Sequence, residues 1–407
     1  MGDRAERNLT LYPAYAAVFA AHFWLPVFFL YFQSHFTLAD VLRLEAIYYF
    51  SVVLLEVPSG YFSDVIGRRI TLIIAAASTA AAHALFCFSE AFALFAVAQA
   101  LLATGIAFNS GTDTALHHDT LAGLGRAEEY GAREARVAHW TFRGSGLAAL
   151  LGGLAAALDL RYAYALSLLG ALAGLALAFS MVEPDAPDRD RRLALRGFAV
   201  QVYQALQALR QPALCWLSGY AVLMVVLNHL PYEFYQPYLE ALLGARGLET
   251  AATPALSGAV TLVTMLIAGQ VAGRSIRLRD RIGLARTLLL GTALQAAIIA
   301  AMAFFIHPIM VGLILLRSCP RALMTAPRNA AIAPLIQPRY RATYLSLESL
   351  AGRLAFAGVL WGLATLDTPE DAGLGPILKA ATAIAAIALL VLIATAGLLK
   401  KEPPRQP

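Results

Sequence analysis

Long runs of apolar residues recur along the whole chain, separated by short polar segments that carry most of the charged side chains. An α-helix needs about 20 consecutive apolar residues to cross the hydrocarbon core of a bilayer. Within the runs the apolar positions are continuous, so the pattern favours helices over the alternating strands of a membrane barrel. The runs predict an all-α polytopic membrane protein with twelve membrane-spanning helices, at residues 12–32, 43–62, 70–89, 92–114, 138–158, 162–182, 213–237, 254–274, 285–306, 308–328, 341–366 and 376–399.

The longest polar interruption divides the predicted spans into six and six. It opens with the charged, proline-bearing stretch EPDAPDRDRR, which is typical of a linker. Phe198, Val202, Leu206 and Leu209 then recur at helical spacing, which predicts an amphipathic helix on the membrane surface. Three parts are therefore predicted: an N-terminal six-helix half at 1–182, a cytoplasmic linker with an amphipathic helix at 183–212, and a C-terminal six-helix half at 213–407.

Composition and charge agree with a membrane protein. Of the 407 residues, 59% are hydrophobic and only 14% are charged, whereas about a quarter of the residues of a soluble domain are charged. The net charge of +5 does not indicate nucleic-acid binding, because 23 of the 31 lysines and arginines lie on one side of the predicted membrane and only four on the other. Arginine and lysine gather on the cytoplasmic side, so both termini are expected to be cytoplasmic.

One polar segment, SGYFSDVIGRRITLI, combines charges and glycines in the short cytoplasmic turn between the second and third predicted spans. Gly60 is expected to allow two helices to approach closely, and Gly67 is expected to permit a sharp turn. Asp64 is expected to neutralise a neighbouring arginine or to accept hydrogen bonds from a helix N-terminus. Arg68 and Arg69 add to the positive charge of the cytoplasmic side.

The order of residues in this loop, G-x-x-x-D-x-x-G-R-R, resembles the signature loop of the major facilitator superfamily. The preceding Glu56-Val57-Pro58 is similar to that of many bacterial members, and a degenerate echo, Asp280-Arg281-Ile282-Gly283, follows the eighth predicted span. The resemblance implies a bacterial twelve-helix transporter with two pseudo-symmetric six-helix halves, in which the loop from Gly60 to Arg69 acts as a gate. Val65 departs from the pattern, where the family usually has a basic residue, which implies a less tightly latched loop.

Two other segments, SGTDTALHHDTL and RYRATYLSLESL, also resemble bacterial members of the family but indicate no substrate. Many proton-coupled drug exporters of the family carry a Gly-Pro-x-x-Gly-Gly run in the fifth span. Here Ala148 and Ala149 stand where Gly-Pro would be. Drug–proton antiport is therefore not established by motif.

Three arginines inside the predicted spans are candidates for substrate binding. Arg317 and Arg321 lie four residues apart in the tenth span and would share a face of one helix, and Arg353 lies near the middle of the eleventh. Charged residues inside a membrane usually mark a substrate or ion path, and guanidinium groups suit carboxylate and phosphate. The alternative is that these arginines pair with buried acids and only hold helices together.

Uncharged polar residues extend the candidate substrate site. Asn109 of the fourth span, Asn228 and Tyr232 of the seventh, and His22 of the first are candidates to contact the substrate. A lone histidine is more often packed and hydrogen-bonded, so the structural interpretation of His22 stays open.

Titratable residues in the fourth and seventh spans are candidates for carrying protons. Asp113 follows Asn109 by four residues and precedes His117 by four, so the three share a helix face. Glu233 and His229 share a face of the seventh span, in which Pro231 is expected to break the helix locally. Bracing of a gate by hydrogen bonds is the alternative for each of these residues.

The predicted function is secondary active transport of a small organic solute by alternating access. Proton-coupled export of a drug or metabolite is the first interpretation, and proton-coupled uptake of an organic anion is the alternative that the arginines favour. No GxxxxGK[ST] loop and no metal-ligand spacing occurs, and the three cysteines lie inside apolar runs. We therefore expect no cofactor, metal, disulfide or enzyme activity. The expected partners are protons, the solute and the bilayer of a bacterial inner membrane, and the chain is expected to be a monomer.

Overall fold

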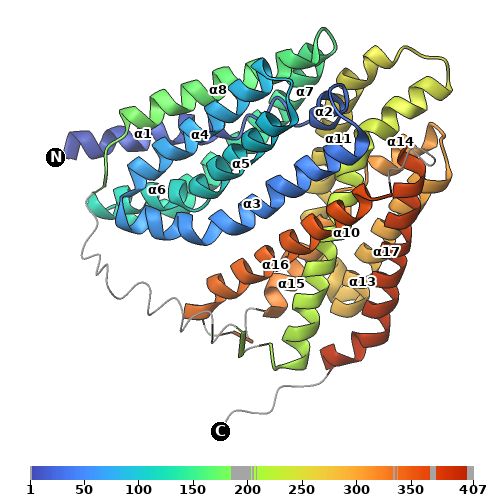
Figure 1. Cartoon of the computed structure of the whole chain (residues 1–407). Coiled ribbons are helices and arrows are strands. Elements are labelled where there is room, and N and C mark those ends of the chain that lie inside the picture. The colour runs from blue at the N-terminus through green and yellow to red at the C-terminus, as the bar shows by residue number, and fades with distance from the viewer. Residues whose placement is uncertain are drawn as a thin grey trace. The chain divides into compact units, whose positions relative to one another are not determined.

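The computed structural model describes residues 2–184, 203, 206–207, 209–332, 335–336, 338–366 and 373–400 (Figure 1). Nearly all of these residues lie in helices, and no strand occurs among them, which confirms the all-α prediction. The chain divides into two compact units. Unit 1 is Met1–Ala194 with Ala251–Leu262, and unit 2 is Leu195–Thr250 with Val263–Pro407.

In unit 1, α4 packs mainly against α5 and α8, and α3 packs against α5. The N-terminal helix α1 packs against α6, α7 and α8. The elements of this unit are α1 (Gly2–Phe19), α2 (Phe28–Gln33), α3 (Leu38–Val65), α4 (Arg68–Phe88), α5 (Phe92–Asn109), α6 (Thr112–Gly123), η1 (Ala127–Glu129), α7 (Tyr130–Ala156), α8 (Leu160–Ser180) and the first half of α11 (Thr253–Ala272).

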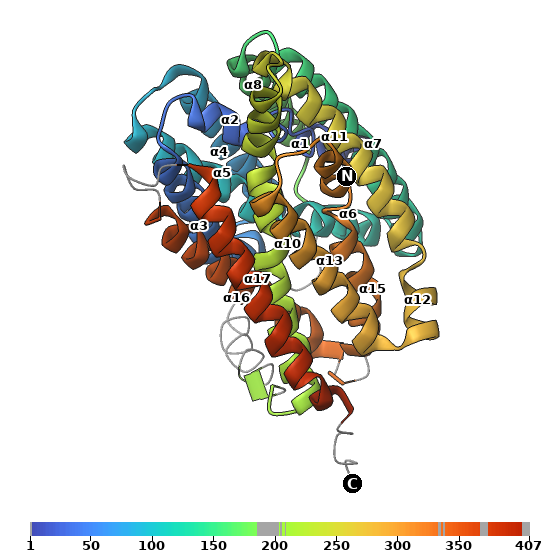
Figure 2. The ribbon, with the colours of Figure 1, turned by 90° about the vertical axis from the view of Figure 1, so that its right-hand side faces the viewer.

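In unit 2, α13 packs against α17 and α15, and α10 packs against α16 and α13 (Figure 2). The elements of this unit are α10 (Pro212–Ala245), the second half of α11, α12 (Ser275–Ile282), α13 (Leu284–Phe304), α14 (Ile309–Ile314), α15 (Cys319–Ile332), α16 (Pro338–Ala364), α17 (Leu374–Thr395) and η3 (Ala396–Lys400). A short 3-10 turn, η2 (Thr250–Ala252), precedes α11.

Nine helical segments among the described residues are long and apolar enough to cross a membrane. The predicted spans 12–32, 43–62 and 138–158 have no counterpart among these nine. The first is broken, the second belongs to a helix with several charged residues, and only Gly144–Ala156 of the third is strongly apolar. The count of twelve spans therefore stays a prediction.

Three predicted spans are not the continuous helices that their apolar runs indicated. The first is interrupted at residues 20–27, where Pro26 lacks an N–H group and would clash with the carbonyl four residues earlier. The fourth ends at Asn109, because Gly111 adopts a left-handed φ of 76° before α6 begins. The tenth is interrupted at residues 315–318, just before Pro320 at the start of α15.

The opposite error occurs in α10, where Pro231 was expected to break the helix. The helix runs without interruption through Pro231 and Pro237. Both prolines and the residues between them are buried or nearly so, and tertiary packing of this kind overrides the local preference.

The helices α4 and α13 begin in the same way, one in each unit. Gly67 and Gly283 precede them with φ of 116° and 86° and similar ψ of 154° and 158°. The Thr71 hydroxyl donates to the Gly67 carbonyl at 2.7 Å, and the Thr287 hydroxyl donates to the Gly283 carbonyl at 2.9 Å. Each helix has 21 residues. This repeated local structure supports the prediction of two related halves.

Serine hydroxyls satisfy the backbone at the break in the first predicted span. The Ser145 hydroxyl of α7 donates to the Ala20 carbonyl at 2.9 Å. The Trp24 N–H donates to Ser167 of α8 at 3.2 Å, and Ser257 of α11 donates to the carbonyl of Pro26. Since water is absent from a bilayer core, side chains of neighbouring helices must supply these partners.

A glycine of α7 lets the broken segment approach closely. A Cβ atom added to Gly152 would lie 1.9 Å from the carbonyl oxygen of Phe23, which is far inside contact distance. Backbone packs directly on backbone here, and no side chain is tolerated.

We predict that Gly152→Ala destabilises the protein by about 1–3 kcal/mol or more, because the added methyl group overpacks this contact. Gly170→Ala in α8 is the matched control. Its added Cβ would come no closer than 3.9 Å to the nearest atom, and alanine is the better helix former by about 1 kcal/mol. Thermal unfolding of the purified proteins in detergent measures both changes. Equal unfolding midpoints for the two variants would contradict the packing described.

Candidate functional site

The glycine-rich loop between α3 and α4 agrees only in part with its predicted roles. Gly67 has a φ of 116°, which confirms that the turn needs glycine. The expectation that Gly60 lets helices approach closely is wrong, because an added Cβ there would meet no atom within 4 Å. The backbone of Asp64 belongs to α3, and its side chain lies outside the described residues.

The two arginines of the loop are fixed by different parts of unit 1. Arg68 donates from Nη1 to the Ser63 hydroxyl at 2.7 Å, and its Nε lies 3.3 Å from a carboxylate oxygen of Asp119 in α6. Arg69 donates from Nη2 to the Phe179 carbonyl at 2.8 Å, near the end of α8. The loop is thereby tied to α3, α6 and α8.

Glu183 caps the start of α4. The N–H groups of Arg68 and Arg69 donate to its two carboxylate oxygens, each at 2.7 Å. A carboxylate is favoured here because the first N–H groups of a helix lack partners and carry partial positive charge. The fit is close, since a Cβ at Gly67 would lie 2.8 Å from the Glu183 carboxyl carbon.

Sequence reasoning assigned Glu183 to the linker and missed this role. The available signal was an acid at the cytoplasmic end of an apolar run, on the side where arginines gather. Beside it lies a cavity of about 620 Å³, lined by Arg7, Arg69 and residues 179–183.

We predict that Glu183→Ala lowers the free energy of unfolding by about 1 kcal/mol, because two N–H groups of α4 lose their acceptor. Glu128→Ala is the control, since Glu128 is exposed and caps no α-helix. Chemical or thermal unfolding in detergent checks the difference. An unchanged midpoint for Glu183→Ala would show that the cap contributes nothing measurable.

A polar cluster occupies the interior of unit 1 between α1, α5, α6 and α7. Tyr15 donates from its hydroxyl to Asn109 Oδ1 at 2.8 Å, and Asn109 Nδ2 lies 3.4 Å from Asp113 Oδ2. The Tyr12 hydroxyl lies 2.9 and 3.1 Å from the two carboxylate oxygens of Glu134. The predicted residues Asn109 and Asp113 are thus brought together, although Gly111 separates their helices.

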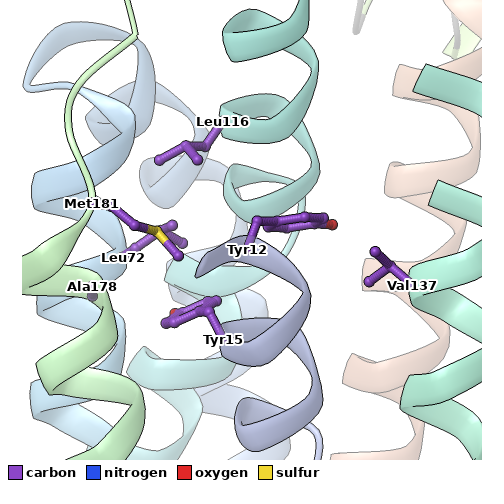
Figure 3. Close-up of a cluster of buried hydrophobic side chains, with 7 residues drawn as sticks. All are labelled: Tyr12, Tyr15, Leu72, Leu116, Val137, Ala178 and Met181. Carbon is purple, nitrogen blue, oxygen red and sulfur yellow. The ribbon is translucent and has the colours of Figure 1, made fainter. Parts of the chain in front are cut away.

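The cluster also contains residues that sequence reasoning missed. Tyr12 and Tyr15 are almost completely buried, and they pack with Leu72, Leu116 and Met181 (Figure 3). The sequence showed these tyrosines only as part of an apolar run, and it showed Glu134 only as part of a charged loop. Neither pattern reveals a contact made across more than a hundred residues.

His22, the remaining candidate in unit 1, lies in the break between α1 and α2. Its ring is 5.8 Å from that of Trp24. Within the described part of the chain, no hydrogen bond joins its ring to another predicted site residue. His22 is therefore not part of the polar cluster.

In unit 2, Arg317 lies in the break between α14 and α15 and is only 4% exposed. It donates from Nη1 to the Thr264 hydroxyl at 2.7 Å, and its guanidinium lies 4.1 Å from the centre of the Tyr235 ring. Arg321 lies in the first turn of α15 with an exposed side chain. The expectation that both arginines share one face of a continuous helix is wrong, because the break separates them.

The structure brings several predicted residues of unit 2 together around His229 of α10. Arg321 and Arg353 of α16 lie close enough for their charges to act on His229. The rings of His229 and Tyr232 are 6.3 Å apart, and Asn228 donates to Met324 in α15 at 3.8 Å. Residues of α10, α15 and α16 that the sequence analysis singled out are thus neighbours in unit 2.

Two acidic residues of unit 2 are buried in different helices. Glu233 is completely buried in α10, one turn beyond His229. Glu348 of α16 is also buried and pairs with Arg328 of α15. The ion pair of Arg328 and Glu348 thus joins α15 to α16.

A metal site finds no support within the part of the chain that the structure describes. No group of three or more histidine, cysteine, aspartate or glutamate side chains is arranged there to hold an ion. The chemistry that the two polar clusters offer is hydrogen bonding, charge pairing and proton exchange.

The sequence profile of the Major Facilitator Superfamily matches residues 11–359. The chain belongs to the major facilitator superfamily. The resemblance carried by the loop between α3 and α4 is thereby confirmed. No functionally curated protein sequence matches the chain.

Solved structures of other transporters share the major facilitator fold of this chain. The nucleoside transporter NupG has a TM-score of 0.75 at 10% identity, covering 98% of this chain and 99% of that one. An auto-inhibited peptide transporter of the POT family has a TM-score of 0.70 at 15% identity, covering 100% and 99%. A D-xylose–proton symporter has a TM-score of 0.66 at 14% identity, covering 95% and 96%. At such low identity the likeness concerns the fold alone.

Proposed function

We propose that this member of the superfamily is a proton-coupled secondary transporter that exports a small organic solute across a bacterial inner membrane. The observation that carries the proposal is that clusters of polar side chains lie beside helix breaks in both units. Intramembrane polar residues mark solute and ion paths, and interrupted helices form the binding sites of many transporters. The proposal includes alternating access by a monomer with both termini in the cytoplasm, and the distribution of arginine and lysine supports that position of the termini.

The two clusters, together with His22 outside them, supply groups for both tasks of such a transporter. Asn109 and His22 of unit 1, and Arg317, Arg321, Arg353, Asn228 and Tyr232 of unit 2, are proposed to contact the solute. Glu233, His229 and Asp113 are proposed to carry the proton, because each is titratable and lies inside a spanning helix.

Uptake of an organic anion with protons is the second candidate. It is favoured by the position of Arg321 and Arg353, whose positive charges act on the same region of α10. Guanidinium groups bind carboxylates through paired hydrogen bonds. The charge of the preferred solute therefore distinguishes the two candidates.

We predict that tetraphenylphosphonium or ethidium raises the thermal midpoint of the detergent-purified protein, and that benzoate and citrate do not. A ligand at 100 times its Kd stabilises the folded state by about 2.7 kcal/mol. Stabilisation by the cations should be stronger at about pH 8 than at about pH 5.5, since protons and cations compete for the same acids. It should be kept or strengthened in Arg321→Ala, because loss of a positive charge from the proposed site does not weaken the binding of a cation.

The opposite result supports the second candidate. Stabilisation by the organic acids, lost in Arg321→Ala and retained in Arg286→Ala, would identify an anion carrier and overturn the export proposal. Arg286 is the matched control because it lies on α13 with an exposed side chain.

The loop between α3 and α4 is proposed to gate the cytoplasmic side. We predict that Asp64→Asn leaves expression unchanged but shifts the balance between inward-open and outward-open states, because one charge of the loop is removed. Accessibility of single cysteines placed on the two sides of the membrane measures that balance. An unaltered labelling pattern would remove the gating role from Asp64.

A further inference from the structure

The cluster in unit 1 contains a histidine–carboxylate pair that the assignments above do not use. His117 Nδ1 lies 2.8 Å from Glu134 Oε2, and both oxygens of the same carboxylate lie within 3.1 Å of the Tyr12 hydroxyl. The rings of Tyr12 and His117 are stacked with centroids 4.3 Å apart. A carboxylate only accepts, so Nδ1 carries the hydrogen in this arrangement and the neutral ring keeps its lone pair on Nε2.

The histidine of this pair is buried, whereas its glutamate is partly exposed. The side chain of His117 is 2% exposed, whereas that of Glu134 is 25% exposed. Glu134 lies in the second turn of α7, which begins at Tyr130 directly after the polar segment that joins α6 to α7. Water therefore reaches the carboxylate from the side of that segment, which the arginine distribution assigns to the cytoplasm.

Within the described residues, no ion pair other than that with His117 joins a charged side chain to Glu134. His117 is faced by His118 of its own helix and by Tyr130 and Arg133 of α7. The helix α5 has no titratable residue, and Arg68 of α4 is paired with Asp119.

Arg133 lies close enough for its charge to act on His117, and it is paired with Glu129. Its Nε donates to Glu129 at 2.8 Å, and Arg126 donates to the same carboxylate at 2.7 Å. These hydrogen bonds lower the pKa of Glu129 to about 2. Glu129 therefore holds Arg133 as a charged partner throughout the physiological range, and the charge that His117 and Glu134 share is set by protons.

A series of polar side chains leads from His117 and Glu134 into the interior of unit 1. The carboxylates of Glu134 and Asp113 both lie close enough for their charges to act on the Tyr12 phenol. Asp113 continues to Asn109, and Asn109 accepts from Tyr15, which is fully buried. Phenol, imidazole and carboxyl groups in sequence are able to pass a proton by hydrogen-bond exchange.

We infer that His117, Glu134 and Tyr12 form the site at which the transporter exchanges its proton with the cytoplasm. A proton from cytoplasmic water adds to His117 Nε2, and the imidazolium that forms stays paired with the Glu134 carboxylate. Release returns the proton to water, and no other bond is made or broken. Tyr12 positions the carboxylate and connects it with Asp113. This inference rests on the proposed proton coupling and adds the residues through which the proton enters or leaves.

The test compares two kinds of transport in proteoliposomes that contain full-length protein. The first is accumulation of radiolabelled tetraphenylphosphonium or benzoate driven by a pH gradient, and the second is exchange of the same solute at equal pH on both sides. Loss of a proton site reduces the first by roughly tenfold or more, and reduces the second far less. The variants are His117→Gln, Glu134→Gln and Tyr12→Phe.

The chain offers matched controls for these variants. His118→Gln changes the adjacent histidine, whose side chain is 52% exposed, and Glu128→Gln changes an exposed glutamate of the neighbouring turn. Both controls should keep wild-type transport of either kind. Tyr12→Phe keeps the stacked ring and removes only the hydroxyl, so it should fold normally and shift the pH profile of gradient-driven transport.

Each outcome has a distinct meaning. Selective loss of gradient-driven transport in His117→Gln and Glu134→Gln supports the site. Equal loss of both kinds of transport, or an unchanged pH profile in all three variants, overturns it and leaves a structural brace. A wild-type protein that ignores the pH gradient with both solutes overturns the proposed function itself, and the inference with it.

Discussion

The rest of this structure depends on one constraint: a backbone polar group inside a bilayer must find its partner within the protein. The apolar runs satisfy it by forming helices. The break at residues 20–27 satisfies it differently, with hydroxyls of Ser145, Ser167 and Ser257 from three other helices. These serines and Gly152 are therefore needed for the structure of the first predicted span, although they lie far from it in the chain. Removing any of them leaves a buried donor or acceptor without a partner, or fills space that the backbone needs.

The breaks in the helices also determine where polar side chains cluster. Gly111 separates α5 from α6, and the cluster of Asn109, Asp113 and their tyrosine partners lies directly around that point. Arg317 lies in the break before α15, where a threonine hydroxyl and a tyrosine ring contact it. A continuous helix would have turned these side chains elsewhere or buried them against apolar neighbours. Local departures from regular helix thus position residues of both candidate clusters.

The features that depend on a local pattern of residues could be predicted from the sequence. Apolar runs located most of the helices, and the spacing of Gly67, Arg68 and Arg69 identified the family. The breaks were missed because a hydropathy pattern does not register a single Pro26 or Gly111 within a long apolar run, and the same limit produced the wrong expectation at Pro231. The contact of Glu134 with Tyr12 was missed because it joins segments more than a hundred residues apart. The contact of Glu183 was missed because this residue caps α4 from outside that helix. Their residue types alone carry no information about that pairing.

Glu183 has a consequence for how the start of α4 responds to its surroundings. The start of α4 is a ready anion site, with two N–H groups and two arginines. Because Glu183 follows α8 after only a few residues of chain, its carboxylate is present at that site at an effective concentration on the order of millimolar or higher. Phosphate and acidic metabolites must outcompete a tethered occupant. The helix end is thereby insulated from the ionic composition of the cell, and it responds instead to whatever draws the segment after α8 away from it.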